Sequence, residues 1–193
     1  MMTDRLRIEN TCFKRHTLLS THEGQLWRIH CGMVRAITWD DQGQIAPLGF
    51  WGKGSIIGSQ LNPITPYEFE CLNSVEVEPL VLEGQIFTQT LLTHIHQSGE
   101  LMRILHCRRV EVRLLQLIDW FAQNFGTRSR DRIYMELPLT HQQIAESISS
   151  TRVTVTRLIR QFELAKTLQW SRHHQVVYLN RHKSTERWLR PIG

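Results

Sequence analysis

Residues 139–169 read LTHQQIAESISSTRVTVTRLIRQFELAKTLQ, and this stretch predicts two helices joined by a short turn. Thr140 followed three residues later by Gln143 has the pattern of a capping box, so the first helix should begin directly after Thr140. Ser, Ser and Thr occupy positions 149–151, where short hydroxyl side chains favour a turn and a helix N-cap. The second helix should then run from about 152 to 164.

Both expected helices have two unlike faces. In the first helix, apolar residues face inward (Ile144, Ala145 and Ile148) and polar residues face outward (His141, Gln142, Glu146 and Ser147). In the second, the inward stripe is Val155, Leu158, Ile159 and Phe162, and the outward face is Arg152, Val153, Thr156, Arg157 and Arg160. Arginine can pair with guanine and valine can touch a thymine methyl, so this outward face suits a DNA major groove. The alternative is an ordinary solvated face, which leaves the capped helix and turn before it unexplained.

The charge of the chain is divided unevenly along its length. From residue 127 onward there are 12 Lys plus Arg against 5 Asp plus Glu, a net charge of +7. The first 126 residues have 11 against 13, a net charge of −2. A basic C-terminal module therefore follows a mildly acidic one, as expected if the C-terminal part alone meets phosphate.

The segment HQQIAESISSTRVTVTRL, residues 141–158, resembles the helix-turn-helix of the Crp/Fnr superfamily of bacterial transcription regulators, and most closely that of the cyanobacterial global nitrogen regulators. The resemblance implies that Arg152, Val153 and Arg157 read bases. The cyclic-AMP receptor branch has glutamate where this chain has Val153, and valine cannot accept a hydrogen bond from cytosine. The resemblance therefore implies a palindromic GTA-type site. Ser149 stands where the family usually has glycine, and a positive φ there would disfavour serine.

Further residues are expected to contact the DNA backbone: Thr140, His141, Gln142, Thr151, Thr154, Thr156, Arg160, Arg172 and His173. The last two belong to a segment in which 168–170 and 175–179 are short strand candidates. This segment resembles the wing hairpin of the family, whose tip would meet phosphate. The alternative, that the tip holds ordinary polar turn residues, is equally open.

The N-terminal part of the chain has short runs separated by turn signals. The runs at 26–30, 33–39, 45–49 and 74–82 alternate in hydrophobicity or are β-branched, which predicts antiparallel strands in a small barrel or roll. WGKGSIIG, residues 51–58, resembles part of the cyclic-nucleotide-binding-like β-roll of the same superfamily. The expected class is α+β, with a sensor-like roll at 1–84, a helical dimerisation segment at 85–106 and a winged helix-turn-helix at 107–193.

The expected roll has few cations with which to hold an anionic effector. Between Arg35 and Arg103 there is one basic side chain, Lys53, against eight acidic ones. The Arg-Ser or Arg-Thr pair that holds a cyclic phosphate in nucleotide-binding relatives is missing from NPITPYEFE, residues 62–70, which argues against cyclic AMP. The sensor arginine of the nitrogen regulators' 2-oxoglutarate site is also missing. A neutral effector and control by a partner without any ligand both remain open.

Cysteine and histidine spacing argues against a metal or another cofactor. The cysteines at 12, 31, 71 and 107 form neither a CxxC pair nor a tight cluster, so we expect reduced, mostly buried thiols. His94 and His96 form an HxH that would fit an alternative class, a cupin-like metal enzyme on a β-roll. They lie in a helical stretch without the matching Glu and Gly, so surface or core histidines, and no enzyme, are expected.

Residues 85–123 are rich in apolar residues at helical spacing, with an imperfect heptad seam at Leu91, Leu101, Leu105, Val112 and Leu115 that Ser98 and Gly99 interrupt. The resemblance implies that a long helix here pairs two subunits, although the stretch is shorter than in the family, so the spine is short or two helices have merged. With no apolar run of ~20 residues and a polar N-terminus, we expect a cytoplasmic protein without membrane contact. Its partners would be double-stranded DNA, a second copy and RNA polymerase.

Overall fold

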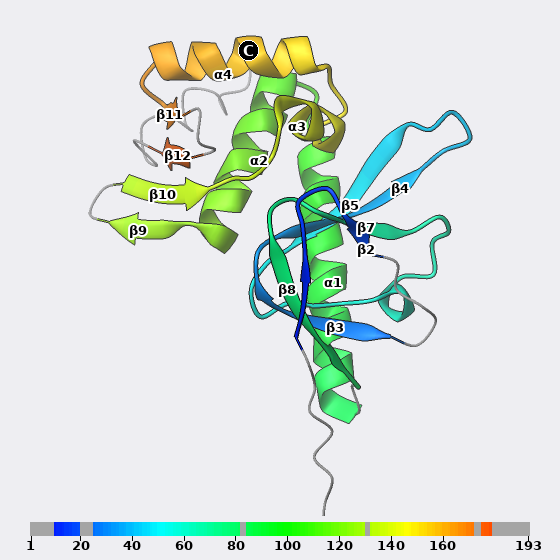
Figure 1. Cartoon of the computed structure of the whole chain (residues 1–193). Coiled ribbons are helices and arrows are strands. Elements are labelled where there is room, and N and C mark those ends of the chain that lie inside the picture. Colours follow the sequence, from blue (N-terminus) through cyan, green and yellow to red (C-terminus); the bar gives the residue numbers. More distant parts are fainter. Residues whose placement is uncertain (1–9, 20–24, 82–83, 130–131, 172–174, 179–193) are drawn as a thin grey trace, which may run out of the picture. The chain divides into compact units, whose positions relative to one another are not determined.

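The computed structural model describes residues 10–19, 25–81, 84–129, 132–171 and 175–178. The chain forms two compact units, Met1–Ser98 and Gly99–Gly193, and each unit is described by itself (Figure 1). The first unit holds β-strands and most of one long helix, and the second holds three further helices and a small sheet. This organisation confirms the expected α+β class.

The first unit contains two antiparallel four-stranded sheets. One sheet has the order β1-β8-β3-β6 and the other β2-β7-β4-β5. The strands are β1 (Thr11–Phe13), β2 (Leu18–Leu19), β3 (Leu26–Cys31), β4 (Val34–Trp39), β5 (Ile45–Trp51), β6 (Ile56–Ile57), β7 (Glu68–Cys71) and β8 (Val75–Leu80). These strands cover all four runs that the sequence predicted, and their pairing confirms the β-roll.

The core of the roll lies between the two sheets. It is formed by Leu19, Ile29, Val34, Ala36, Trp51, Ile57, Phe69, Cys71, Val75 and Val77. Across the ladder, Ala36 is paired with Phe69, so a small residue leaves room for a large ring. Gly32 joins β3 to β4 at a φ of 89°, and a Cβ atom there would collide with the carbonyl oxygen of Ser74. This turn therefore requires glycine.

The cysteines are free, but fewer are buried than the sequence suggested. Cys71 is buried, and burial, with the charge of Glu70, raises the pKa of its thiol to about 12. Cys12 and Cys31 are exposed, and the expectation of mostly buried thiols was wrong for them. Both are ladder partners of Glu76, so they occupy outward positions on either side of β8. Among the described residues, no group of three His, Cys, Asp or Glu could hold a metal ion.

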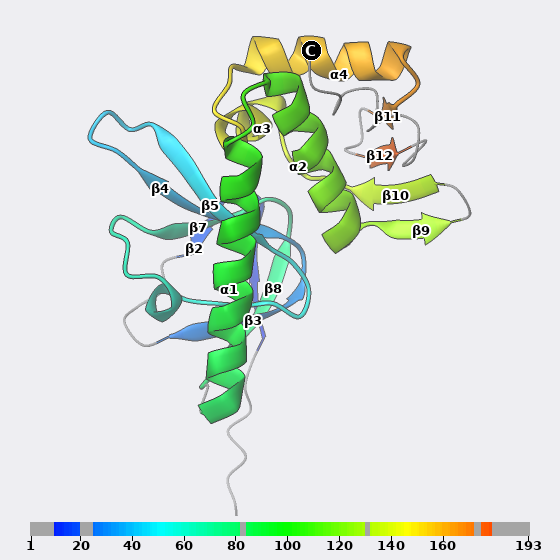
Figure 2. The ribbon, with the colours of Figure 1, turned by 180° about the vertical axis from the view of Figure 1, so that it is seen from behind.

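One continuous helix, α1 (Gly84–Leu105), follows the roll and passes through Ser98 and Gly99 without a break. Its first part is held to the roll, as Figure 2 shows from behind. The Gln97 amide donates to the Phe50 carbonyl at 2.9 Å and accepts from the Phe50 N–H at 3.3 Å. Phe50 lies on β5, an edge strand of its sheet, and Gln97 bonds to both its backbone N–H and its carbonyl.

The apolar residues of α1 are divided between two faces, and this corrects the expected dimerisation seam. Leu101, Val112 and Leu115, three of its five members, are buried within the chain at 6%, 9% and 2% exposure, and Leu91 is half-buried. Leu105 stays accessible at 36%. The open apolar stripe consists instead of Leu92, Ile95 and Met102, which are 54%, 68% and 61% exposed. We call these three residues the α1 stripe.

The second unit is built on α2 (Val110–Phe125), which begins after a short connection from α1. A four-stranded antiparallel sheet of order β11-β12-β10-β9 accompanies it. Its strands are β9 (Thr127–Ser129), β10 (Arg132–Glu136), β11 (Leu168–Trp170) and β12 (Gln175–Tyr178), and the remaining helices are α3 (His141–Ser147) and α4 (Arg152–Leu164). Within the described ranges, no helix is long and apolar enough to cross a membrane.

Candidate nucleic-acid interface

α3 begins at His141, as the capping-box pattern predicted. The Thr140 hydroxyl accepts from the Gln143 N–H at 3.1 Å, and the Gln143 side chain accepts from the Thr140 N–H at 2.9 Å. These two bonds satisfy donors that a helix N-terminus leaves unpaired. One outward position was wrong: Ser147 is buried, because its hydroxyl donates to the Gln143 carbonyl at 2.7 Å instead of facing solvent.

The turn between α3 and α4 has a left-handed residue at Ser149, whose φ is 48°. The next N–H, of Ser150, donates back to the Ala145 carbonyl at 2.9 Å, and the Ser149 N–H approaches Glu146 at 3.4 Å. These bonds close the end of α3 in a Schellman-like arrangement that glycine favours. The suspected positive φ is therefore present, and serine adopts it at a cost in free energy.

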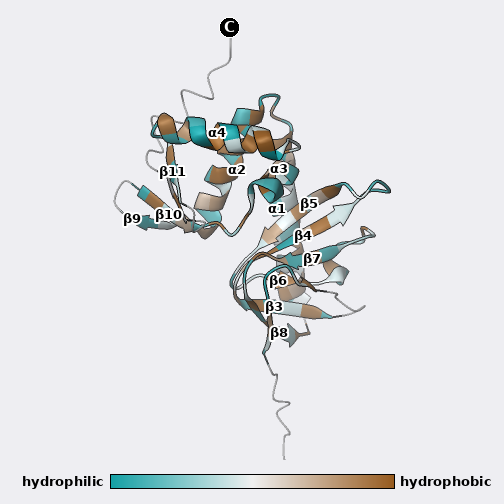
Figure 3. Ribbon diagram, turned by 45° about the horizontal axis from the view of Figure 1, so that its top comes forward, coloured by the Kyte–Doolittle hydropathy of each residue, from teal (hydrophilic) through white to brown (hydrophobic). Residues whose placement is uncertain are grey.

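α4 runs from Arg152 to Leu164, as predicted, with Thr151 as its N-cap accepting from the Thr154 N–H at 3.2 Å. Its buried residues are the four of the expected inward stripe: Val155, Leu158, Ile159 and Phe162. The five residues of the expected outward face are all exposed: Arg152, Val153, Thr156, Arg157 and Arg160. Figure 3 shows the resulting alternation of hydrophilic and hydrophobic residues along this helix. Val153 is 77% exposed, so its methyl groups are accessible to a partner.

Hydrogen bonds connect α3, α4 and the wing. The Thr156 hydroxyl donates to the Arg152 carbonyl at 2.9 Å, so its oxygen is free to accept from His141 Nδ1, also at 2.9 Å. The ring of His141 also meets that of Trp170 on β11 edge-on, at 5.7 Å between centroids. The backbone N–H of Trp170 donates to the Glu163 carboxylate on α4 at 3.1 Å. His141 is therefore a link between three elements as well as an expected phosphate contact.

The outward face of α4 carries three arginines, and one of them, Arg157, is close enough to α2 to influence Glu111 there. Arg157 donates to Gln161 at 3.4 Å, one turn further along α4. Partial burial raises the pKa of Glu111, but hydrogen bonds from its own backbone and Arg109, with the charges of Arg109 and Arg157, lower it on balance. The charge of Arg157 therefore acts on α2 as well as on the outward surface.

The other expected backbone contacts lie around the N-termini of the two helices. Gln142 is exposed and donates to Glu146 at 3.1 Å, while Thr154 is half-buried with its hydroxyl 2.9 Å from that of Thr151. The two wing strands pair as predicted, with Gln169 opposite Val177. Arg172 and His173 at the tip lie outside the described residues, so their contacts stay predictions.

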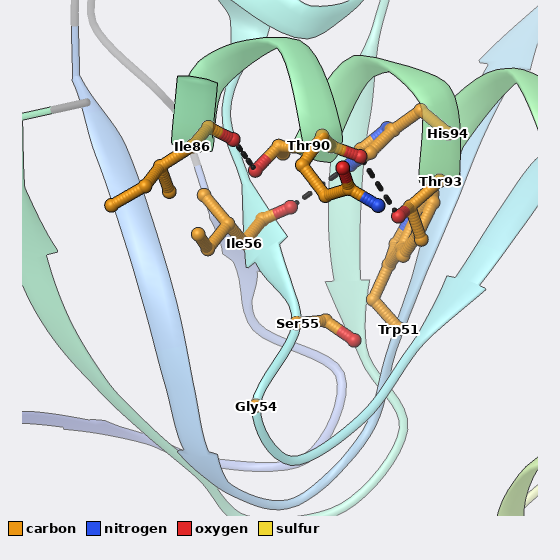
Figure 4. Close-up of a pocket in the computed structure, with 9 residues that line it drawn as sticks. Trp51, Gly54, Ser55, Ile56, Ile86, Thr90, Thr93 and His94 are labelled. Atoms are coloured by element: carbon orange, nitrogen blue, oxygen red, sulfur yellow. Dashed lines mark hydrogen bonds between the residues drawn. The ribbon is translucent and has the colours of Figure 1, made fainter. Parts of the chain in front are cut away.

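A pocket lies in the first unit, between the turn before β6 and α1, and is shown in Figure 4. The pocket measures about 160 Å³ and is lined by Trp51, Gly54, Ser55, Ile56, Ile86, Gln89, Thr90, Thr93 and His94. None of these nine residues is an acid, a lysine or an arginine. His94 is buried and stacks on Trp51 at 3.7 Å, with Nε2 2.9 Å from the Ile56 carbonyl, and burial lowers its pKa. His94 is thus a core histidine, one of the two roles expected for it, and His96 is exposed.

Comparison with known proteins gives matches over both units. The Crp-like helix-turn-helix domain model matches residues 108–183. The regulatory protein CysR of Synechococcus elongatus is 37% identical over 154 residues, which cover 78% of this chain and 75% of CysR. The global nitrogen regulator of the same species is 37% identical over 85 residues, 44% of this chain and 38% of that protein. The likeness to that regulator therefore covers less than half of its length.

Solved structures match the fold over nearly the whole chain at low sequence identity. FixK2 from Bradyrhizobium japonicum has a TM-score of 0.78 and 15% identity, covering 94% of this chain and 96% of FixK2. TTHB099 of Thermus thermophilus, described as a CRP-family transcriptional regulator, has a TM-score of 0.73 and 18% identity, covering 92% and 95%. Both comparisons support a β-roll followed by a helix-turn-helix unit.

Proposed function

Since this chain belongs to the Crp/Fnr superfamily of DNA-binding transcription regulators, we propose that it acts as a homodimer that reads a palindromic GTA-type site. Its relatives are regulators rather than enzymes, which removes the cupin-like alternative. The observation that carries the proposal is the outward face of α4, where Val153 is exposed between Arg152 and Arg157. The working location is the cytoplasm, where bacterial DNA lies.

The chemistry of this face favours particular bases. Each arginine offers a planar fork of donors that matches the O6 and N7 acceptors of guanine. Val153 has no acceptor for the cytosine amino group, but its methyl groups can contact the thymine methyl. With Arg152 and Arg157 on either side, this combination supports a half-site of guanine and thymine-adenine pairs. Thr151 and Thr154 lie at the N-terminus of α4, where a phosphate oxygen is favourable.

The α1 stripe supports a two-fold dimer. Leu92 and Ile95 are three residues apart, and Met102 follows Ile95 by seven, the spacing of a coiled-coil seam. Gly99 falls one heptad after Leu92, where the absence of a side chain lets two helices approach closely. Three large apolar side chains more than half exposed on one helix are best explained by a second copy that covers them. Two copies would place two recognition helices on successive major grooves.

The pocket beside His94 supports a small neutral ligand over cyclic AMP, because a cyclic phosphate needs a cationic or multiply donating partner. Control by a protein partner without any ligand is the alternative, and RNA polymerase is the partner that a bound regulator would address.

Selection of bound fragments from random DNA tests the proposal in one experiment. We expect enrichment of an inverted repeat whose half-site contains GTA, with half-site centres about 10 base pairs or a multiple apart. A single unrepeated motif would contradict the dimer. Enrichment of a palindrome without GTA would contradict the assigned base contacts while leaving the family assignment intact.

A further inference from the structure

Arg113, an arginine outside the DNA-facing surface, bridges the connection between α1 and α2 and the turn between α3 and α4. Arg113 lies in the first turns of α2, between the buried residues Val112 and Leu114, and is half-buried. One guanidinium nitrogen donates to the Cys107 carbonyl at 3.3 Å, and the other terminal nitrogen donates to the Ser149 carbonyl at 3.3 Å. The two acceptors are 42 residues apart in the chain, so this one side chain joins distant segments.

Each acceptor lies where a helix has ended. Cys107 follows the last residue of α1 by two positions, in the connection to α2. Ser149 is the left-handed residue of the turn between α3 and α4. Carbonyls at such positions have no intrahelical donor and need one from elsewhere. The rigid fork of a guanidinium can serve both at once, whereas the single ammonium group of a lysine cannot hold them in one plane.

We propose that Arg113 is a positioning residue for DNA reading: it ties the α1–α2 connection to the turn that precedes the recognition helix. The turn leads directly into the N-cap Thr151 and the base-reading residues Arg152 and Val153. A change in the direction of the Ser149 carbonyl therefore rotates the N-terminus of α4. The buried stripe of α4 begins at Val155, so Arg152 and Val153 lie between the turn and the first buried residue of the helix.

The bridge also gives a route by which the end of α1 influences α4. The connection after α1 is short, and the Cys107 thiol within it is 3.1 Å from the Gln116 side chain on α2. Arg113 donates to the carbonyl of Cys107 and to that of Ser149. A displacement of the α1–α2 connection is therefore transmitted to the α3–α4 turn through this one side chain. This inference rests on the proposed DNA-reading function of α4, although the bridge itself does not require it.

The test compares Arg113→Met, which keeps the length of the side chain but removes its donors, with Arg113→Lys and the control Arg103→Met. Arg103 lies in the same unit and pairs with Glu100 at 3.0 Å. In Arg113→Met we expect hydrogen exchange of the Ser150 N–H to accelerate about tenfold, the factor that corresponds to one lost charge-assisted hydrogen bond. Exchange of amides in the middle of α4 should stay unchanged, and Arg103→Met should alter neither.

DNA binding gives the functional readout. On the sequence selected by the wild-type chain, the affinity of Arg113→Met should fall about tenfold, while its affinity for random-sequence DNA stays close to wild type. On the selected sequence, the affinity of Arg113→Lys should lie between those of wild type and Arg113→Met. An unchanged Ser150 exchange rate, or equal losses on both DNAs, would overturn the proposal. If the wild-type chain selects no sequence, the proposed function fails, and Ser150 exchange still decides whether the bridge exists.

Discussion

Replacing Ser149 with glycine should stabilise the second unit, although it adds no contact. Ser149 holds a φ of 48°, a conformation that costs a residue with a Cβ atom about 1–2 kcal/mol. Glycine avoids that cost but loses roughly 0.5–1 kcal/mol through the greater freedom of its unfolded chain. The side chain is exposed, and within the described part of the chain no hydrogen bond of its hydroxyl would be lost. The net gain should therefore be about 0.5–1 kcal/mol.

Thermal and urea unfolding, followed by circular dichroism, would measure this gain. For a unit of this size the melting temperature should rise by about 2–8 °C. Ser150→Gly is the matched control, because Ser150 is the adjacent residue and does not have a positive φ. Its substitution should bring only the loss from chain freedom and lower the stability.

The comparison of the two variants decides whether the backbone conformation is the cause. If Ser149→Gly destabilises the unit as much as Ser150→Gly does, then the left-handed conformation does not cost what we infer. Sequence preference on DNA should be the same for Ser149→Gly and wild type, because Arg113 donates to the carbonyl of Ser149 and not to its side chain.

Three further predictions concern DNA reading, assembly and pH. Arg157→Ala should cost ~1–3 kcal/mol of binding free energy at one base position, whereas Arg160→Ala should weaken binding evenly across sequences; titration against a panel of single-base variants would show the difference, and an even loss in Arg157→Ala would assign it to phosphate. Ile95→Glu should convert a dimer to a monomer in sedimentation, whereas Ile64→Glu, at another exposed isoleucine, should not; a dimeric Ile95→Glu would place the interface elsewhere. Because burial lowers the pKa of His94, the unfolded chain binds more protons than the folded chain below pH ~6.5, and the first unit should lose stability as the pH falls below that value. His94→Gln should reduce this loss. Equal shifts of the urea midpoint between pH 7.5 and 5.5 in His94→Gln and wild type would contradict the prediction.

Local signals in the sequence were sufficient to predict the two helices of the helix-turn-helix, α3 and α4. The capping pair Thr140 and Gln143, the hydroxyl-rich turn and the 3.6-residue apolar period predicted the start of α3 and both ends of α4. These signals act within one or two helical turns, so they do not depend on the rest of the fold. The strands of the roll were found for a similar reason, since alternation and turn residues are also local.

The exposure of a side chain was harder to predict where the local sequence pattern was compatible with both a buried and an exposed position. Ser147 was placed outside because serine is polar, but its hydroxyl bonds to the preceding turn of its own helix and tolerates burial. Cys12 and Cys31 were placed inside because cysteine is usually buried, but the ladder puts both on the outward side of their sheet. Strand register decided this, and register depends on the partner strand.

The sequence alone determined that α1 is apolar and helical, but only the tertiary structure decided which of its faces is used inside the subunit. The helix has apolar residues on two faces, and periodicity treats them alike. Hydrogen bonds from His94 and Gln97 to the roll fix the rotation of its first part, and the α1 stripe of Leu92, Ile95 and Met102 remains open. The bridge from Arg113 to Ser149 was equally beyond the sequence, because residues 36 apart meet only after α2, α3 and α4 have packed. Local pattern specifies the elements, whereas contacts between distant residues specify which of their surfaces remain available.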